Sequence, residues 1–178
     1  MNGAALVDRH DMDRLARRRA ALIAAAVTVS AAALDQATKA VATQMLASGP
    51  AHVGVLHLRL VANRGILLGM IELPTWLITL IALTVVAVTG RAARRGNTLS
   101  SIAFALASGG AIGNLIDRYL QRPNFPPNAV VDWLSFGGMT FNLSDVFLVA
   151  AVLLLSGYES SGQTASSEIV GGVGARDD

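Results

Sequence analysis

The sequence of 178 residues contains no cysteine, which excludes disulfide bonds, zinc–thiolate centres and a cysteine nucleophile. Histidine is also scarce, and only His10, His52 and His57 are present. A histidine-based catalytic triad or zinc site therefore has little material to work with. We expect neither a metal ion nor another cofactor.

Charged residues are few as well. They make up 15% of the chain, against about a quarter in soluble domains. Hydrophobic residues make up 53%, and the mean hydropathy is +0.52. This balance predicts a membrane protein. The formal net charge of +2 is too small to indicate nucleic acid as a partner, and the Lys and Arg residues form no stripe.

Four apolar stretches approach the roughly 20 residues that a helix needs to cross a bilayer. They cover residues 20–38, 73–89, 98–116 and 141–158. We predict an all-α membrane protein with four transmembrane helices and a small β-containing external loop region. The predicted parts are a basic tail at 1–19, a membrane domain at 20–158 with external loops at 40–72 and 118–140, and a disordered tail at 159–178.

The two external loops differ in character. In the first, Leu56, Leu58 and Leu60 alternate with His57 and Arg59, a pattern that predicts a short strand with one apolar face. The second contains three prolines and a pair of glycines, so we expect it to be irregular.

Basic residues set the expected orientation. Nine Lys and Arg residues flank one side of the predicted membrane domain and five flank the other. The positive-inside rule then places both termini in the cytoplasm. The basic start and the apolar stretch after it also resemble a cleavable signal peptide. Asp35 and Lys39, which follow at once, favour a helix that is retained.

Five acidic residues lie outside the two tails, and all fall at or near the external ends of the predicted helices: Asp35, Glu72, Asp117, Asp132 and Asp145. Ionised side chains within a bilayer cost about 2.5–3.5 kcal/mol on insertion scales, so such residues are functional candidates. Helical spacing adds Gly110 and Asn114 to the face of Asp117, and Asn142 to that of Asp145. Gly110 has no side chain, so another helix or a substrate backbone can approach it closely.

Plainer interpretations exist for several of these residues. Asp35 and Lys39 are spaced as an ion pair within one helix. Asp117 beside Arg118 can hold the end of a helix, and Asn114 and Asn142 can join helices by hydrogen bonds. From residue chemistry alone, the catalytic partner of Asp145 is either Asp117 or Asp132.

Five short motifs resemble those of a known family. They are DQATK at 35–39, NRG at 63–65, GGAIGNLIDR at 109–118, VVD at 130–132 and FNLSD at 141–145. In this order they resemble the bacterial type II (lipoprotein) signal peptidases, over about residues 20–158. The ten-residue block together with VVD and FNLSD is the most specific part of the resemblance.

The resemblance implies an intramembrane aspartyl endopeptidase with Asp132 and Asp145 as its catalytic pair. Its substrates would be prolipoproteins in membrane lipid, cut before a diacylglyceryl-modified cysteine at the outer leaflet of the bacterial cytoplasmic membrane. Asp117 would be structural. The residues expected to bind substrate or support the site are Asp35, Lys39, Asn63, Gly110, Asn114, Arg118 and Asn142.

Some positions depart from the family pattern. Leu67 and Leu68 stand where Ala and Phe are frequent, and Ser144 stands where Ala is usual. A catalytically inactive paralogue and a small proton-coupled transporter therefore remain alternatives. The transporter reading predicts acids near the middle of the membrane and on both sides of it. A different intramembrane aspartyl protease is disfavoured because a GxGD signature is absent.

A paired-carboxylate mechanism follows from this assignment. Two carboxylates a few ångströms apart share one proton, so one can activate water while the other donates a proton. Asp145 lies near the start of a predicted helix, where the helix dipole favours negative charge. We therefore expect Asp145 to be the ionised partner and Asp132 the acid.

Overall fold

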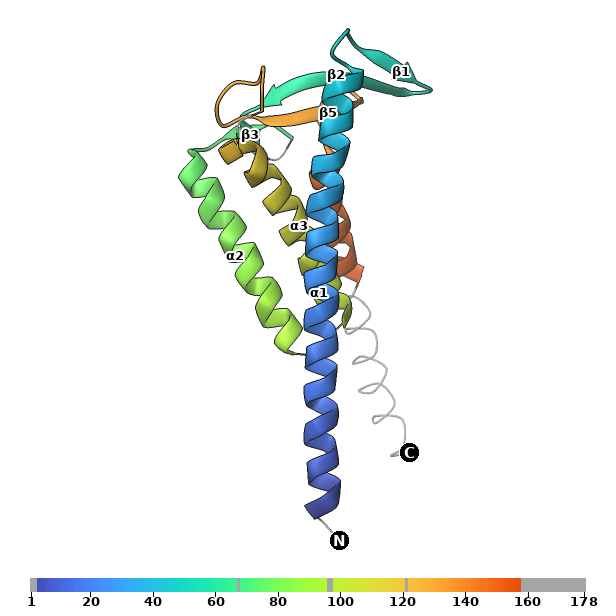
Figure 1. Ribbon diagram of the computed structural model, residues 1–178, viewed down its shortest axis with the longest axis vertical. Helices are drawn as coiled ribbons and strands as arrows, with labels where there is room; N and C mark the ends of the chain where they lie inside the picture. Colours follow the sequence, from blue (N-terminus) through green and yellow to red (C-terminus); the bar gives the residue numbers. More distant parts are fainter. Residues whose placement is uncertain (1–2, 67, 96–97, 121, 158–178) are drawn as a thin grey trace, which may run out of the picture.

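The computed structural model describes residues 3–66, 68–95, 98–120 and 122–157, so the tail expected to be disordered at 159–178 lies outside the described residues. Its helices are α1 (Gly3–Met45), α2 (Thr75–Arg94), α3 (Thr98–Leu120) and a further helix at Leu143–Gly157. The helices lie side by side, and the strands cover one end of them (Figure 1).

Three of the described helices are long and apolar enough to cross a membrane: His10–Met45 within α1, α2, and α3. Large apolar side chains on them face outward, such as Leu22 and Leu83, which are 71% and 58% exposed. Exposure of this kind carries no penalty in lipid, whose tails are as apolar as leucine. The prediction of membrane-spanning helices is confirmed for three stretches, whereas the helix Leu143–Gly157 is apolar but shorter.

The first helix is longer than the apolar stretch that predicted it. Helical residues continue from Gly3 through the basic segment and on to Met45, so the expected loop at 40–72 begins within a helix. No glycine or proline occurs between Gly3 and Gly49, so nothing in the chain stops the helix earlier. The end of hydrophobicity was therefore a poor guide to the end of the helix.

Small residues bring the helices close together. Ala24, Ala93 and Ala105, from α1, α2 and α3, form a buried cluster. At Gly109 of α3, a Cβ atom would lie 2.5 Å from the Cβ of Ala31 on α1. Such close approach of backbones is the usual way for helices to pack in membranes.

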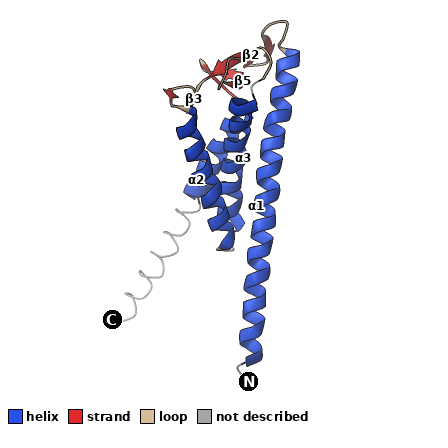
Figure 2. Cartoon of the chain, turned by 60° about the vertical axis from the view of Figure 1, so that its left-hand side comes forward, coloured by secondary structure: helices blue, strands red, loops and turns tan. Residues whose placement is uncertain are grey.

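A four-stranded antiparallel sheet lies across the end of the helices (Figure 2). Its order is β1 (Ala51–Val53), β2 (Leu56–Asn63), β5 (Val130–Phe136) and β6 (Met139–Phe141). A separate hairpin joins β3 (Gly65–Ile66) to β4 (Ile71–Glu72). The strand predicted from the leucine alternation is confirmed as β2.

The prediction of an irregular second loop over 118–140 is wrong in part, because the segment contains regular structure. α3 continues to Leu120, and the loop contains β5 and the start of β6. β5 pairs with β2, which places Val61 opposite Asp132. This pairing joins segments about 70 residues apart in the chain, so local pattern carried little sign of it.

Candidate active site

Asp132 lies within β5 and is almost fully buried, with 1% of its surface exposed. Each of its carboxylate oxygens accepts a side-chain amide. Asn63, the last residue of β2, donates from Nδ2 to Oδ2 at 2.8 Å, and Asn142 donates from Nδ2 to Oδ1 at 2.6 Å. Among the described residues, no cation lies within salt-bridge distance of Asp132.

Asp145 is positioned by the start of the last helix. Its Oδ2 atom accepts the backbone N–H of Asn142 at 3.1 Å, and its own N–H donates to Oδ1 of Asn142 at 3.2 Å. This reciprocal pair is the geometry of a helix capping box, with Asn142 as the N-cap. The same Asn142 side chain reaches Asp132, so one residue holds both carboxylates.

Burial raises the pKa of the Asp132 carboxyl to about 7, and the negative charge of Asp145 adds to the rise. The hydrogen bonds from Asn63 and Asn142 and the charge of Lys39 act in the opposite direction. A carboxyl with this pKa is protonated in a large fraction of molecules near neutral pH. Asp132 can therefore donate a proton where an ordinary aspartate cannot.

A second cluster, of charged residues around Lys39, lies next to the pair of acids. The Lys39 ammonium lies 2.7 Å from Asp35, 3.0 Å from Asp117 and 2.9 Å from the Asn114 side-chain oxygen. These three partners match the three donors of an ammonium group. Asn114 in turn accepts a hydrogen bond from Asn142 at 3.2 Å, which connects the cluster to the pair of acids.

The two acids between which residue chemistry could not choose have different surroundings. Asp117 pairs with Lys39 and, at 2.8 Å, with Nε of Arg122, and it also accepts the backbone N–H of Val131. Asp117 is therefore neutralised by two cations. Asp132 is held by neutral amides alone among its hydrogen-bond partners.

Glycines on α3 let the last helix approach. A Cβ atom on Gly110 would lie 2.7 Å from the backbone oxygen of Ser144, and one on Gly113 would lie 2.5 Å from Oδ2 of Asp35. The backbone N–H of Ser144 donates to Asp35 Oδ1 at 3.0 Å. Of the two roles predicted for Gly110, the structure therefore has close approach of a helix.

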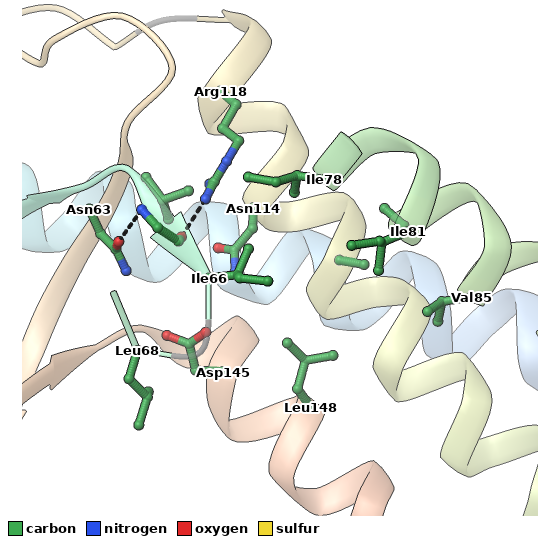
Figure 3. Close-up of a pocket in the computed structure, with 14 residues that line it drawn as sticks. Asn63, Ile66, Leu68, Ile78, Ile81, Val85, Asn114, Arg118, Asp145 and Leu148 are labelled. Atoms are coloured by element: carbon green, nitrogen blue, oxygen red, sulfur yellow. Dashed lines mark hydrogen bonds between the residues drawn. The ribbon is translucent and has the colours of Figure 1, made fainter. Parts of the chain in front are cut away.

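Arg118 extends from α3 toward the β3–β4 hairpin (Figure 3). It is 4% exposed, and its Nη2 atom donates to the backbone oxygen of Gly65 at 2.6 Å. Its Nε and Nη1 atoms are buried without a hydrogen-bond partner. Buried guanidinium nitrogens of this kind are available to a ligand that enters beside them.

A cavity of about 200 Å³ lies beside Arg118, Asn114 and Asp145 (Figure 3). Its opposite wall is apolar and includes Ile78, Ile81 and Val85 of α2, Leu148 of the last helix, and Ile66 and Leu68 of the hairpin region. Asp132 faces a neighbouring cavity that shares Asn63, Gly65 and Leu68 with the first. The two acids therefore border adjoining spaces.

The structure brings the predicted site residues together. Asn63 and Asn142 donate to Asp132, and Asn114 accepts from Asn142 and Lys39. Asp35 and Asp117 contact Lys39, and Arg118 lines the cavity beside Asp145. Sequence reasoning missed Gln36, which donates to the backbone oxygen of Gly113 at 2.9 Å and accepts from Arg122 at 2.6 Å. Its position inside the DQATK motif was the only signal. Leu67, one of the departures from the family pattern, lies outside the described residues.

A family model and individual relatives point to the same family. A family model described as signal peptidase (SPase) II matches residues 27–159. A lipoprotein signal peptidase of Bifidobacterium adolescentis is 41% identical over 155 residues, covering 83% of this chain and 82% of the relative. One of Mycobacterium avium is 35% identical over 148 residues, covering 80% of each.

Two solved structures share the fold. Both are described as bacterial membrane enzymes studied by the in meso method. One has a TM-score of 0.67 at 20% identity and covers 80% of this chain and 90% of its own. The other has a TM-score of 0.59 at 22% identity and covers 74% and 88%.

Proposed function

The chain belongs to the signal peptidase II family, and we propose that it removes signal peptides from prolipoproteins with Asp132 and Asp145 as its catalytic pair. The observation that carries the assignment is the bridging of the two carboxylates by Asn142. Two acids held by one residue, beside a cavity and without a paired cation, suit proton transfer better than ion pairing.

The proposed reaction is hydrolysis by an activated water. The Asp145 carboxylate takes a proton from water, and the resulting hydroxide attacks the scissile carbonyl. Protonated Asp132 stabilises the developing oxyanion by donating its proton. Collapse of the tetrahedral intermediate breaks the C–N bond as the proton held by Asp145 passes to the leaving amine. One hydroxyl of the intermediate returns a proton to Asp132 as the new carboxyl group forms, so the pair regains its starting protonation state. No covalent intermediate with the enzyme is formed.

The other site residues receive supporting roles. Asn142 and Asn63 orient Asp132. Asn114 accepts hydrogen bonds from both Asn142 and Lys39, so it connects these two residues. The two free nitrogens of Arg118 are available to a substrate carbonyl. Asp35 and Asp117 balance the buried charge of Lys39, which supports a structural role for Asp117.

The proposed substrate enters from the membrane. The apolar wall formed by α2 and Leu148 suits the side chains of a signal peptide, and lipid surrounds the same helices. We place the cleavage site before a diacylglyceryl-modified cysteine, as the family resemblance implies.

We further propose four membrane spans, with Leu143–Gly157 as the core of the fourth, in the cytoplasmic membrane. The exposed arginines Arg91, Arg94 and Arg95 lie at the end of α2 away from the sheet, which favours that end for the cytoplasm. The acid pair then lies near the outer leaflet, and both termini are cytoplasmic.

The test is cleavage of a diacylglyceryl-modified prolipoprotein by the purified full chain in detergent. Asp132→Asn and Asp145→Asn should lose turnover by three or more orders of magnitude while eluting as folded protein, whereas Asp117→Asn should keep measurable turnover. Glu72→Gln is the matched control, because Glu72 is an exposed acid at the same end of the molecule. Full activity in either of the first two variants contradicts the assignment, and a silent wild type on several lipidated substrates indicates an inactive paralogue.

A further inference from the structure

A second cleft lies between the middle part of α1 and the end of α2 that is far from the sheet. Its volume is about 620 Å³. The walls are built from small residues: Ala21, Ala24 and Ala25 on α1 face Gly90 and Ala93 on α2. A Cβ atom built on Gly90 would meet nothing within 4 Å, so the space is open at that point.

The inner part of this cleft has an apolar character. Its two threonines direct their hydroxyls to α3: Thr28 donates to the backbone oxygen of Ala105 at 3.2 Å, and Thr89 donates to that of Phe104 at 2.8 Å. These hydroxyls are therefore already bonded within the protein. A polar ligand would lose hydrogen bonds to water on entering, whereas a hydrocarbon chain would not.

The mouth of the cleft is cationic. Arg17 and Arg18 on α1 and Arg94 on α2 line it, and all three are exposed. In the described part of the chain, no carboxylate lies within salt-bridge distance of any of them. The nearest acid in sequence is Asp13, one helical turn before Arg17. The arginines at the mouth therefore make no ion pair within the described structure.

We propose that this cleft binds one phospholipid with an anionic headgroup. The headgroup phosphate lies between the arginines of the two helices, where guanidinium groups bind phosphate oxygens well. One acyl chain lies along the small residues of the walls. Basic pockets between membrane helices on the cytoplasmic side have this chemistry. The cleft lies at the opposite end of the helices from Asp132 and Asp145, so the lipid site is separate from the proposed peptidase site.

The choice of an anionic lipid over other occupants follows from the two halves of the cleft. A zwitterionic headgroup carries its own cation, which the arginines would repel. Free phosphate matches the mouth but leaves the apolar walls uncovered. Only a molecule that combines an anion with a hydrocarbon chain matches both parts.

The experiment measures the thermal midpoint of the full chain in neutral detergent as lipid is added. Phosphatidylglycerol should raise the midpoint in a saturable manner, whereas phosphatidylcholine and inorganic phosphate should not. Arg17→Gln with Arg94→Gln should weaken the apparent affinity for phosphatidylglycerol by about tenfold or more, because two charges near the phosphate are lost. Arg14→Gln with Arg95→Gln is the matched control: it removes the same charge from exposed arginines that do not line the cleft.

A third variant tests the open space of the cleft independently of the arginines at its mouth. Gly90→Leu keeps every arginine but fills the open space, and it should also weaken phosphatidylglycerol binding while leaving the midpoint without lipid close to that of wild type. The proposal is overturned if both double variants bind phosphatidylglycerol equally, since binding would then reflect overall surface charge. It is also overturned if inorganic phosphate reproduces the effect of the lipid, or if wild type shows no shift with phosphatidylglycerol.

Discussion

At the scale of single residues, the site depends on how buried charges are partnered. Lys39 is fully buried and satisfied by three oxygens, while Asp132 is buried against neutral amides. Lys39 and Arg122 stabilise the charge of Asp117, whereas burial without a paired cation disfavours the charge of Asp132. Asp117 and Asp132, at the same end of the molecule, therefore have opposite chemical properties.

The activity of the proposed enzyme should fall at alkaline pH. Burial, and then the charge of Asp145, raise the pKa of the Asp132 carboxyl to about 7. An acid carries its proton below its pKa, so the form that can donate dominates below about pH 7 and decreases about tenfold per unit above it. We expect kcat/KM on a lipidated substrate to fall by about tenfold between pH 8 and pH 9. Glu72→Gln should follow the same profile, and a profile that is flat to pH 9 contradicts the role of Asp132 as the acid.

Lys39→Met should destabilise the protein strongly. The substitution leaves the carboxylates of Asp35 and Asp117 buried, with the ammonium that faces both of them removed. Breaking a buried charge cluster by removing one partner costs about 3–5 kcal/mol. Thermal unfolding in detergent measures the loss. Adding Asp35→Asn and Asp117→Asn to Lys39→Met should restore part of the stability, and a thermal midpoint of Lys39→Met equal to that of wild type would show that the cluster contributes little.

At the scale of elements, the start of the last helix is the part that organises the site. Asn142 caps this helix, and its side chain also reaches β5 and α3. The helix can approach α3 because glycines face it there. Asn142 therefore connects the last helix both to α3, on which that helix packs, and to β5, which pairs with β2.

Gly110→Ala should disturb this junction. Its Cβ atom would lie 2.7 Å from the Ser144 backbone oxygen, and a backbone group cannot rotate away. We expect a loss of about 1–3 kcal/mol in stability and a larger proportional loss of turnover, because the helix carrying Asp145 is displaced. Gly90→Ala is the matched control, since a Cβ atom there meets nothing within 4 Å. Equal stability and activity in the two variants would show that the α3 contact is not tight.

At the scale of the whole molecule, the two ends differ in chemistry. The sheet lies at one end of the helices (Figure 1), and exposed arginines gather toward the other. The acid pair lies at the sheet end, because Asp132 is in β5 and Asn142 bridges it to Asp145. The positive-inside rule converts this asymmetry into an orientation in the membrane.

The absence of cysteine makes that orientation easy to measure. Val55→Cys at the β1–β2 turn and Met12→Cys near the start of α1 each introduce one exposed thiol, since these side chains are 78% and 61% exposed. In intact cells from which any outer envelope has been removed, a membrane-impermeant maleimide should label the first variant only. Permeabilised cells should label both. Labelling of Met12→Cys in intact cells would reverse the proposed topology.

Much of this architecture could be predicted from the sequence, because it depends on patterns that extend over only a few residues. Runs of apolar residues marked the spanning helices, and helical spacing placed Asn114 beside Asp117 and Asn142 beside Asp145. The ends of α1 and α3 were harder to predict, because both helices continue past their apolar stretches where no residue interrupts them.

By itself, the sequence determined that acids gather at one end of a set of membrane helices, because hydrophobicity and helical periodicity act over a few residues. Residue chemistry left open whether Asp117 or Asp132 stands with Asp145, and only the family resemblance implied Asp132. The tertiary structure decided that Asn142 bridges Asp145 to Asp132, whereas Lys39 and Arg122 neutralise Asp117. The physical reason is that β5 is positioned by pairing with β2, a contact between distant segments that no local pattern encodes.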